Sequence, residues 1–175
     1  MAVTLKELIS EEAIDKRIRE MGEKISQDYE GEEVLLVTIL KGASFFGCEL
    51  AKRITVPVTI DFMATSSYGS GTSSMGDVKI KKDLDLSAEN KNIIIVEDII
   101  DSGHTLHFLS ELFSTRQAKS VKLCALLDKP ERREVDVDMN YIGFTIPNEF
   151  VVGYGLDYDQ RYRNLPYIAT VDLGE

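Results

Sequence analysis

The chain has 175 residues, 43% of them hydrophobic, and a formal net charge of −10. This length suits one domain, residues 1–175, with its own hydrophobic core. The negative charge argues against a basic surface for nucleic acid, and no apolar segment reads as a signal peptide or a membrane span. We therefore expect neither a nucleic acid nor a membrane as a partner.

The first half of the chain predicts two helices and two strands. Apolar residues recur at helical spacing over residues 10–29, which indicates an amphipathic helix. The run VLLVTIL, residues 34–40, is continuously apolar, as is typical of a strand covered on both faces. Residues 43–54 favour a helix, and residues 56–64 favour a strand.

The second half begins with a Ser- and Gly-rich stretch, SSYGSGTSSMG, which predicts a mobile loop at about residues 66–77. Beyond it the pattern predicts an edge or hairpin strand (78–84), a buried strand (92–97), a helix (105–116), a strand (120–128) and two short strand-like runs (138–144 and 150–157).

The two cysteines, Cys48 and Cys124, both have apolar neighbours. Buried, reduced thiols are therefore expected rather than a disulfide. Reduced thiols favour a cytoplasmic protein.

The alternation of strands and helices predicts an α/β fold with a mainly parallel, twisted sheet flanked by helices. In such sheets, ligands bind beyond the carboxyl ends of the strands. Polar residues follow several predicted strands and should therefore lie close together: Lys41–Gly42, Glu97–Thr105, Asp128–Lys129 and Asp157.

The run IIIVEDIIDSGHTL, residues 93–106, places two carboxylates and a glycine turn at the end of one strand. Neighbouring carboxylates such as Glu97 and Asp98 stay ionised only if a partner donates to them, as ribose hydroxyls or a divalent cation would. Residues 101–105 enter a helix through the turn, where N–H groups and the helix dipole favour a phosphate. The alternative is that Asp101 and Ser102 only cap the helix.

The full run resembles the phosphoribosyl-diphosphate (PRPP) signature of type I phosphoribosyltransferases. Four further segments resemble the branch of that family called the hypoxanthine-guanine phosphoribosyltransferases, in the same order: LKG (40–42), SSYG (66–69), LLDKPERR (126–133) and FVVGYGLDYDQRYRNLPYIA (150–169). The resemblance implies the type I fold, with a small hood subdomain formed by the terminal segments. It also implies purine salvage with Mg²⁺ as cofactor: PRPP and hypoxanthine or guanine would give IMP or GMP and diphosphate. A homodimer or homotetramer is implied as well.

The resemblance places the ribose and its phosphate on the central run. Glu97 and Asp98 would hold the ribose hydroxyls, partly through Mg²⁺. The 5′-phosphate would bind five consecutive residues: Asp101, Ser102, Gly103, His104 and Thr105. Asp101 would also accept the proton of the purine N7. His104 would act through its backbone amide, and two histidines without further ligands make a metal site at His104 and His107 a weak interpretation.

Diphosphate binding is implied for Lys41, Gly42 and Arg163, with a cis peptide at Leu40–Lys41 as the family commonly has. Ser67 and Tyr68 would belong to a lid that closes over the diphosphate and excludes water.

The purine site is implied to contain Ile99, Lys129, Phe150, Val151 and Asp157. Lys129 would donate to the purine O6, so an amino group at that position would be rejected. Phe150 would stack on the ring, Ile99 would cover its other face and the Val151 backbone would meet its edge. Asp157 is also implied as a Mg²⁺ ligand, as are the two carboxylates of the ribose site.

The sequence allows two alternative functions. One is a phosphoribosyltransferase for orotate, adenine or uracil, but Lys129 and the segment 150–157 argue against it. The other is a regulator that keeps the fold and binds PRPP or nucleotides without turnover, against which the acidic charge speaks. Each site residue taken alone also suits a structural or solvated position.

Overall fold

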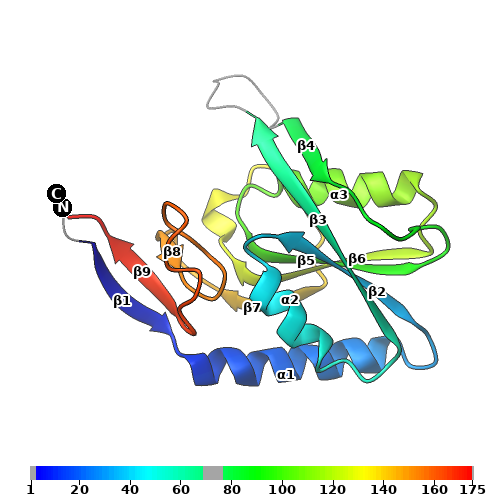
Figure 1. Ribbon diagram of the computed structural model, residues 1–175, viewed down its shortest axis with the longest axis horizontal. Coiled ribbons are helices and arrows are strands. Elements are labelled where there is room, and N and C mark those ends of the chain that lie inside the picture. Colours follow the sequence, from blue (N-terminus) through cyan, green and yellow to red (C-terminus); the bar gives the residue numbers. More distant parts are fainter. Residues whose placement is uncertain (1–2, 69–76, 175) are drawn as a thin grey trace.

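The computed structural model describes residues 3–68 and 77–174, and these form two sheets and three α-helices (Figure 1). The larger sheet has six strands in the order β4-β3-β2-β5-β6-β7. Its strands are β2 (Val34–Leu40), β3 (Val58–Tyr68), β4 (Asp77–Lys82), β5 (Asn92–Ile100), β6 (Ser120–Asp128) and β7 (Tyr141–Thr145). All neighbouring pairs are parallel except β3 and β4, which confirms the predicted α/β fold with a mainly parallel sheet.

The central strands bury both faces, because successive residues of a strand point to opposite sides. Leu36 of β2 and Ile94 of β5 pack in one cluster with α1 (Glu11–Asp28) and α2 (Ser44–Ala51). Their neighbours Leu35 and Ile93 pack in a second cluster with α3 (His104–Thr115). The helices therefore cover the sheet on both sides, as the continuous apolar runs predicted.

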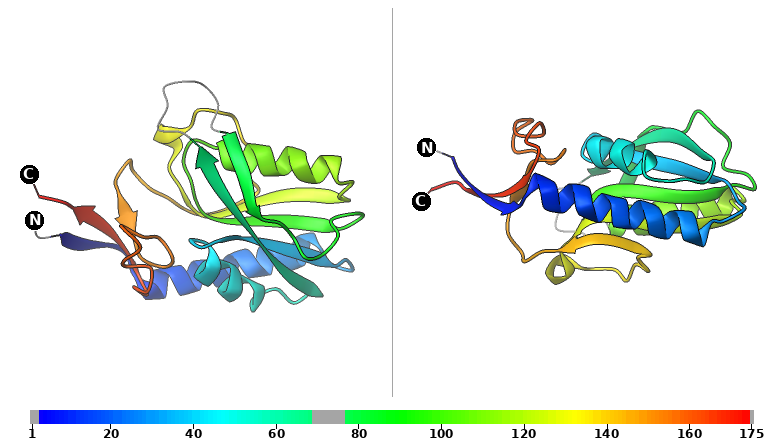
Figure 2. Two further views of the ribbon diagram at one scale, coloured as in Figure 1. Left: turned by 45° about the horizontal axis from the view of Figure 1, so that its top comes forward. Right: turned by 90° about the horizontal axis from the view of Figure 1, so that it is seen from below.

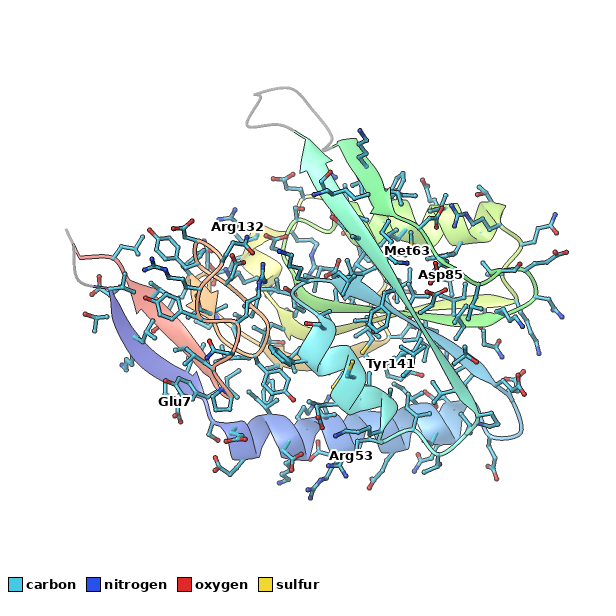
Figure 3. The ribbon with its side chains drawn as sticks, viewed as in Figure 1. Glu7, Arg53, Met63, Asp85, Arg132 and Tyr141 are labelled. Carbon is cyan, nitrogen blue, oxygen red and sulfur yellow. The ribbon has the colours of Figure 1, made fainter. Side chains whose placement is uncertain are left out.

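Helix α1 is attached to both the sheet and α2. The hydroxyl of Tyr141 in β7 donates to Asp28 Oδ2 at 2.7 Å, near the end of the helix. Arg53, just beyond α2, lies against α1, where its Nη2 is 3.5 Å from Asp15 Oδ1 (Figure 3). Gly22 permits this approach, because a Cβ atom there would stand 2.5 Å from Arg53 Cβ.

The terminal segments form a small antiparallel sheet of β1 (Thr4–Ile9), β9 (Ile168–Asp172) and β8 (Val151–Val152), in the order β1-β9-β8. Figures 1 and 2 show β1 and β9 at one end of the molecule, with both chain ends together. The implied hood subdomain is therefore present. Its strands β1 and β9 were not predicted from the sequence.

Three sequence predictions need correction. Strand β3 continues to Tyr68 and β4 begins at Asp77, so the ends of the predicted loop 66–77 are strand, because β4 supplies the ladder partners of residues 64–68. The rest of the predicted lid, 69–76, lies outside the described residues. Helix α2 ends at Ala51 instead of residue 54. Both cysteines are free thiols and Cys124 is buried as predicted, but Cys48 is exposed because it lies on the outer side of α2.

Within the residues that the structure covers, no helix is long and apolar enough to cross a membrane.

Candidate functional site

The carboxyl ends of three central strands meet at one edge of the sheet. In the parallel register, Thr38 of β2 pairs with Val96, and Ile100 of β5 pairs with Asp128 of β6. The segments that follow these strands begin at Lys41, Asp101 and Lys129, so residues far apart in sequence lie at the same edge. This convergence is the one that the strand-end argument predicted.

The acid pair, Glu97 and Asp98, lies near the carboxyl end of strand β5, which ends at Ile100. Glu97 is only 9% exposed, and Asp98 is partly buried. Burial raises the pKa of Glu97 well above its ordinary value, and the charges of Asp98 and Asp101 raise it further. Burial also raises the pKa of Asp98, whereas the Ile99 amide and the positive charge of Arg163 oppose that rise. The raised pKa values mean that two negative charges here are disfavoured, and a bound cation or hydroxyl donors would stabilise the ionised forms.

Hard carboxylate oxygens of this kind suit Mg²⁺, but the three predicted metal ligands do not form one cluster. In the described part of the chain, no group of three or more His, Cys, Asp or Glu side chains is placed to hold a metal ion. Asp157 pairs with Arg163 instead, with 3.3 Å between Asp157 Oδ1 and Arg163 Nη2. Glu97–Asp98 and Asp157 would each supply only one or two ligands, which suits Mg²⁺ because this ion keeps several waters.

The predicted phosphate turn has the backbone of an anion site. Gly103 has φ of 89° and directly precedes α3, which begins at His104. The amide of Ser102 donates to Asp101 Oδ1 at 2.7 Å, which orders the turn. The first amides of a helix have no partner within it and carry its positive dipole. A pocket of about 50 Å³ lies here, lined by Glu97, Ile99, Ile100, Asp101, Ser102, Gly103, Thr105 and Leu106.

A second segment supports the turn from behind. The amides of Glu134 and Val135 both donate to the Ser102 carbonyl, at 3.0 and 3.1 Å. The ring of His104 pairs with Glu134, with 2.7 Å between Nε2 and Oε2. His104 thus pairs with this segment and not with His107, which agrees with the structural reading of its ring.

The predicted diphosphate loop lies against the acid pair. The Leu40–Lys41 peptide is cis, as the resemblance implied. A Cβ atom built on Gly42 would stand 1.8 Å from Asp98 Oδ2. On its other side, the carbonyl oxygen of Gly42 would stand 2.0 Å from a Cβ atom built on Gly155. The loop is therefore held between β5 and the turns that follow β8.

Those turns also carry Arg163, which donates to the Gly155 carbonyl at 2.6 Å through Nη1. Its Nη2 lies 3.3 Å from Gln160 Oε1, and the same oxygen lies 3.4 Å from Lys41 Nζ. Gln160 was not predicted as a site residue, although it lies in the segment DYDQRYR between the predicted site residues Asp157 and Arg163.

The predicted purine residues come from β6 and from the region around β8. The Lys129 amide donates to the Ile100 carbonyl at 2.9 Å, so the backbone of Lys129 lies beside the start of the phosphate turn. Burial lowers the pKa of Lys129, and the negative charge of Asp101 opposes this shift, which makes the two side chains electrostatic neighbours. Phe150 is 50% exposed, and its ring meets Tyr158 edge-on at 5.8 Å. An exposed aromatic face is available to stack on a planar ligand.

Several predicted residues have less distinctive surroundings. Ile99 is partly buried and Val151 is buried in β8. The side chains of Ser67 and Tyr68 lie outside the described residues, so their role in a lid stays a prediction.

The chain matches the model of the phosphoribosyl transferase domain over residues 4–159, which include all of the strand-end segments described above. The chain belongs to the phosphoribosyl transferase family. Within this family it is similar to the hypoxanthine phosphoribosyltransferase of Salmonella typhimurium, with 51% identity over 175 residues that cover 99% of this chain and 98% of that protein. A crystal structure of a hypoxanthine-guanine phosphoribosyltransferase from Bacillus anthracis is 50% identical, with a TM-score of 0.93, over 97% of this chain and 100% of that one.

Some similar phosphoribosyltransferases are parts of longer proteins. The bifunctional protein TilS/HprT of Listeria monocytogenes is 55% identical over 166 residues, which are 95% of this chain but only 26% of that protein. The chain thus spans about a quarter of the length of these bifunctional relatives.

Proposed function

We propose that this phosphoribosyltransferase is a purine salvage enzyme that transfers the 5-phosphoribosyl group of PRPP to hypoxanthine, and to guanine. The products are IMP or GMP and diphosphate. The observation that carries the proposal is that the acid pair, the phosphate turn and Lys129 lie at one edge of the sheet. About 50% identity over nearly the whole chain to proteins named for this activity supports it.

In the proposed reaction, the bond from the sugar C1 to diphosphate breaks and a bond from C1 to the purine N9 forms. The proton on N7 goes to the carboxylate of Asp101, which is exposed at the end of β5. The amides of residues 103–105 and the hydroxyl of Ser102 hold the 5′-phosphate, and Glu97 and Asp98 accept from the ribose hydroxyls. A fixed phosphate at one end and fixed hydroxyls at the other orient C1 toward the purine.

The leaving diphosphate gains negative charge as the bond breaks, and preorganised donors stabilise such charge. Lys41, the Gly42 amide and Arg163 supply these donors. We also propose Mg²⁺ as the cofactor, which the carboxylates of Glu97 and Asp98, and separately Asp157, would hold. It would supply positive charge to offset that of the diphosphate, and it needs few protein ligands because it keeps several waters.

Selectivity for a 6-oxopurine comes from Lys129, which donates to O6. An adenine amino group would place a donor against this donor, and an unpaired buried donor costs several kcal/mol. Phe150 stacks on the purine and Ile99 covers its other face, while the Val151 backbone meets the ring edge.

The test is diphosphate release by the purified chain with Mg²⁺, PRPP and one base at a time. We expect release with hypoxanthine and with guanine, and little with adenine. Binding of PRPP and IMP without release would instead support the regulator, and release with orotate, adenine or uracil alone would support another substrate class.

We further propose a cytoplasmic enzyme that assembles as a homodimer or homotetramer. The two free thiols, one of them exposed, support a reducing compartment. Light scattering coupled to size-exclusion chromatography would measure the mass of the assembly directly. A monomer at micromolar concentration would refute the proposed dimer or tetramer.

A further inference from the structure

The guanidinium of Arg133 contacts two parts of the site at once. Its Nη2 donates to the Asp128 carboxylate, and its Nε donates to the carbonyl oxygen of Asp101 at 3.1 Å. Asp128 directly precedes Lys129, which is proposed to bind the purine. Asp101 is the proposed proton acceptor. The Arg133 side chain therefore joins the end of β6 to the phosphate turn at Asp101.

The stem of Arg133 also packs under the glycine of that turn. A Cβ atom built on Gly103 would stand 3.3 Å from Arg133 Cδ and 3.0 Å from the Val135 carbonyl oxygen. The next amides along the chain, those of Glu134 and Val135, donate to Ser102. The Arg133 segment is thus in contact with the turn through both backbone and side chain.

The positive charge of Arg133 offsets the negative charge of a buried carboxylate, Asp128. Asp128 is only 9% exposed, and the side chain of Arg133 is 21% exposed. A buried carboxylate that loses its cationic partner keeps its desolvation cost without the compensating attraction. Removing Arg133 would therefore leave an unpaired negative charge at Asp128, which pairs in register with Ile100, the residue before Asp101.

We propose that Arg133 is a positioning residue for the transfer reaction. It fixes the backbone of Asp101 relative to β6, and it neutralises the buried charge of Asp128 beside that backbone. This inference rests on the proposed function, and Arg133 acts through other residues without touching a substrate.

The test compares Arg133→Met with Arg19→Met, a matched control at an exposed arginine of α1. With saturating PRPP and hypoxanthine, kcat of Arg133→Met should fall about 10- to 100-fold, because small misplacements of reacting groups cost this much. KM for PRPP should change less than about threefold, because the groups that bind PRPP remain. Arg19→Met should stay within about twofold of the wild type, since exposed charges contribute little.

A double variant separates positioning from simple loss of stability. Adding Asp128→Asn to Arg133→Met removes the unpaired charge and should recover at least about threefold in kcat, and Arg133→Lys should fall between Met and wild type. Thermal melts verify folding, and kcat is expressed per folded molecule. Unchanged kcat in Arg133→Met, or no recovery on adding Asp128→Asn, would overturn the inference.

The same proteins separate failure of the inference from failure of the proposed function. If the wild type releases no diphosphate, the proposed function fails, and calorimetric titration with IMP becomes the deciding measurement. Weaker IMP binding in Arg133→Met but not in Arg19→Met would still support positioning of the site, and equal binding in both would overturn it.

Discussion

Lys41 and Arg163 share one hydrogen-bond acceptor, the side-chain oxygen of Gln160, at 3.4 Å from Lys41 Nζ and 3.3 Å from Arg163 Nη2. Both cations are proposed to bind the diphosphate of PRPP, so the ligand must displace this oxygen. A neutral amide is a weaker competitor than a carboxylate, because hydrogen bonds between ionised partners are roughly twice as strong. Gln160 therefore holds the cations in place without opposing the ligand strongly.

Gln160→Glu should raise KM for PRPP about two- to fivefold, because an exposed ion pair is worth up to about 1 kcal/mol. The effect should shrink as salt is raised, since salt screens exposed charges. Initial rates at several PRPP and salt concentrations would measure both. Gln160→Ala, which removes the acceptor without adding charge, is the control and should leave KM unchanged or lower. A Glu variant that matches the wild type at low salt would show that this oxygen does not compete.

Gly42→Ala tests the close contact between the diphosphate loop and the acid pair. The added Cβ would stand 1.8 Å from Asp98 Oδ2, so either the carboxylate or the loop must move. We expect kcat/KM for PRPP to fall at least about tenfold, because both groups are proposed to bind PRPP and small displacements are costly. Thermal melts serve as the control for folding. A folded variant with wild-type kcat/KM would mean that neither position matters for PRPP.

Asp101→Asn tests the proton acceptor. An amide keeps the shape of the side chain but cannot take the N7 proton, so kcat should fall by about 10²- to 10⁴-fold, the usual contribution of a general base. PRPP affinity, measured by calorimetry, should change much less, because the amides of the turn remain. Unchanged turnover would remove Asp101 from this role.

The sequence predicted the part of the fold that follows from local hydrophobic pattern. The apolar runs at 34–40, 92–97 and 120–128 became β2, β5 and β6, and their carboxyl ends met as the rule for parallel sheets requires. Terminal strand β1 was missed because it is largely exposed, and β9 because it has only five residues, although it begins with two buried ones. The two strands pair with each other across nearly the whole length of the chain. Pairing over such a distance leaves no local signal.

The same limit applies within the site. Glu97, Asp101 and Lys129 were predictable because each lies near or just beyond the carboxyl end of a recognisable strand. Gln160 and Arg133 were missed, because their importance comes from contacts with residues 119 and 32 positions away. Side chains whose partners lie on other elements are visible only after the chain has folded.

The pH dependence of hypoxanthine use tests Lys129. Burial lowers the pKa of its amino group, and the charge of Asp101 opposes the shift only in part. The protonated amine is the stronger donor to O6, so kcat/KM for hypoxanthine should fall as pH rises through this lowered pKa, earlier than for a solvated lysine. Rates measured from neutral to alkaline pH would locate the decline.

Lys129→Ala supplies the comparison for that profile. The variant should lose the part of the alkaline decline that belongs to Lys129, and its preference for hypoxanthine over adenine should fall, because no donor remains to reject the adenine amino group. Since the decline and the preference have the same cause, both should change together. An alkaline limb and a base preference that both persist in Lys129→Ala would exclude Lys129 as the donor to the purine.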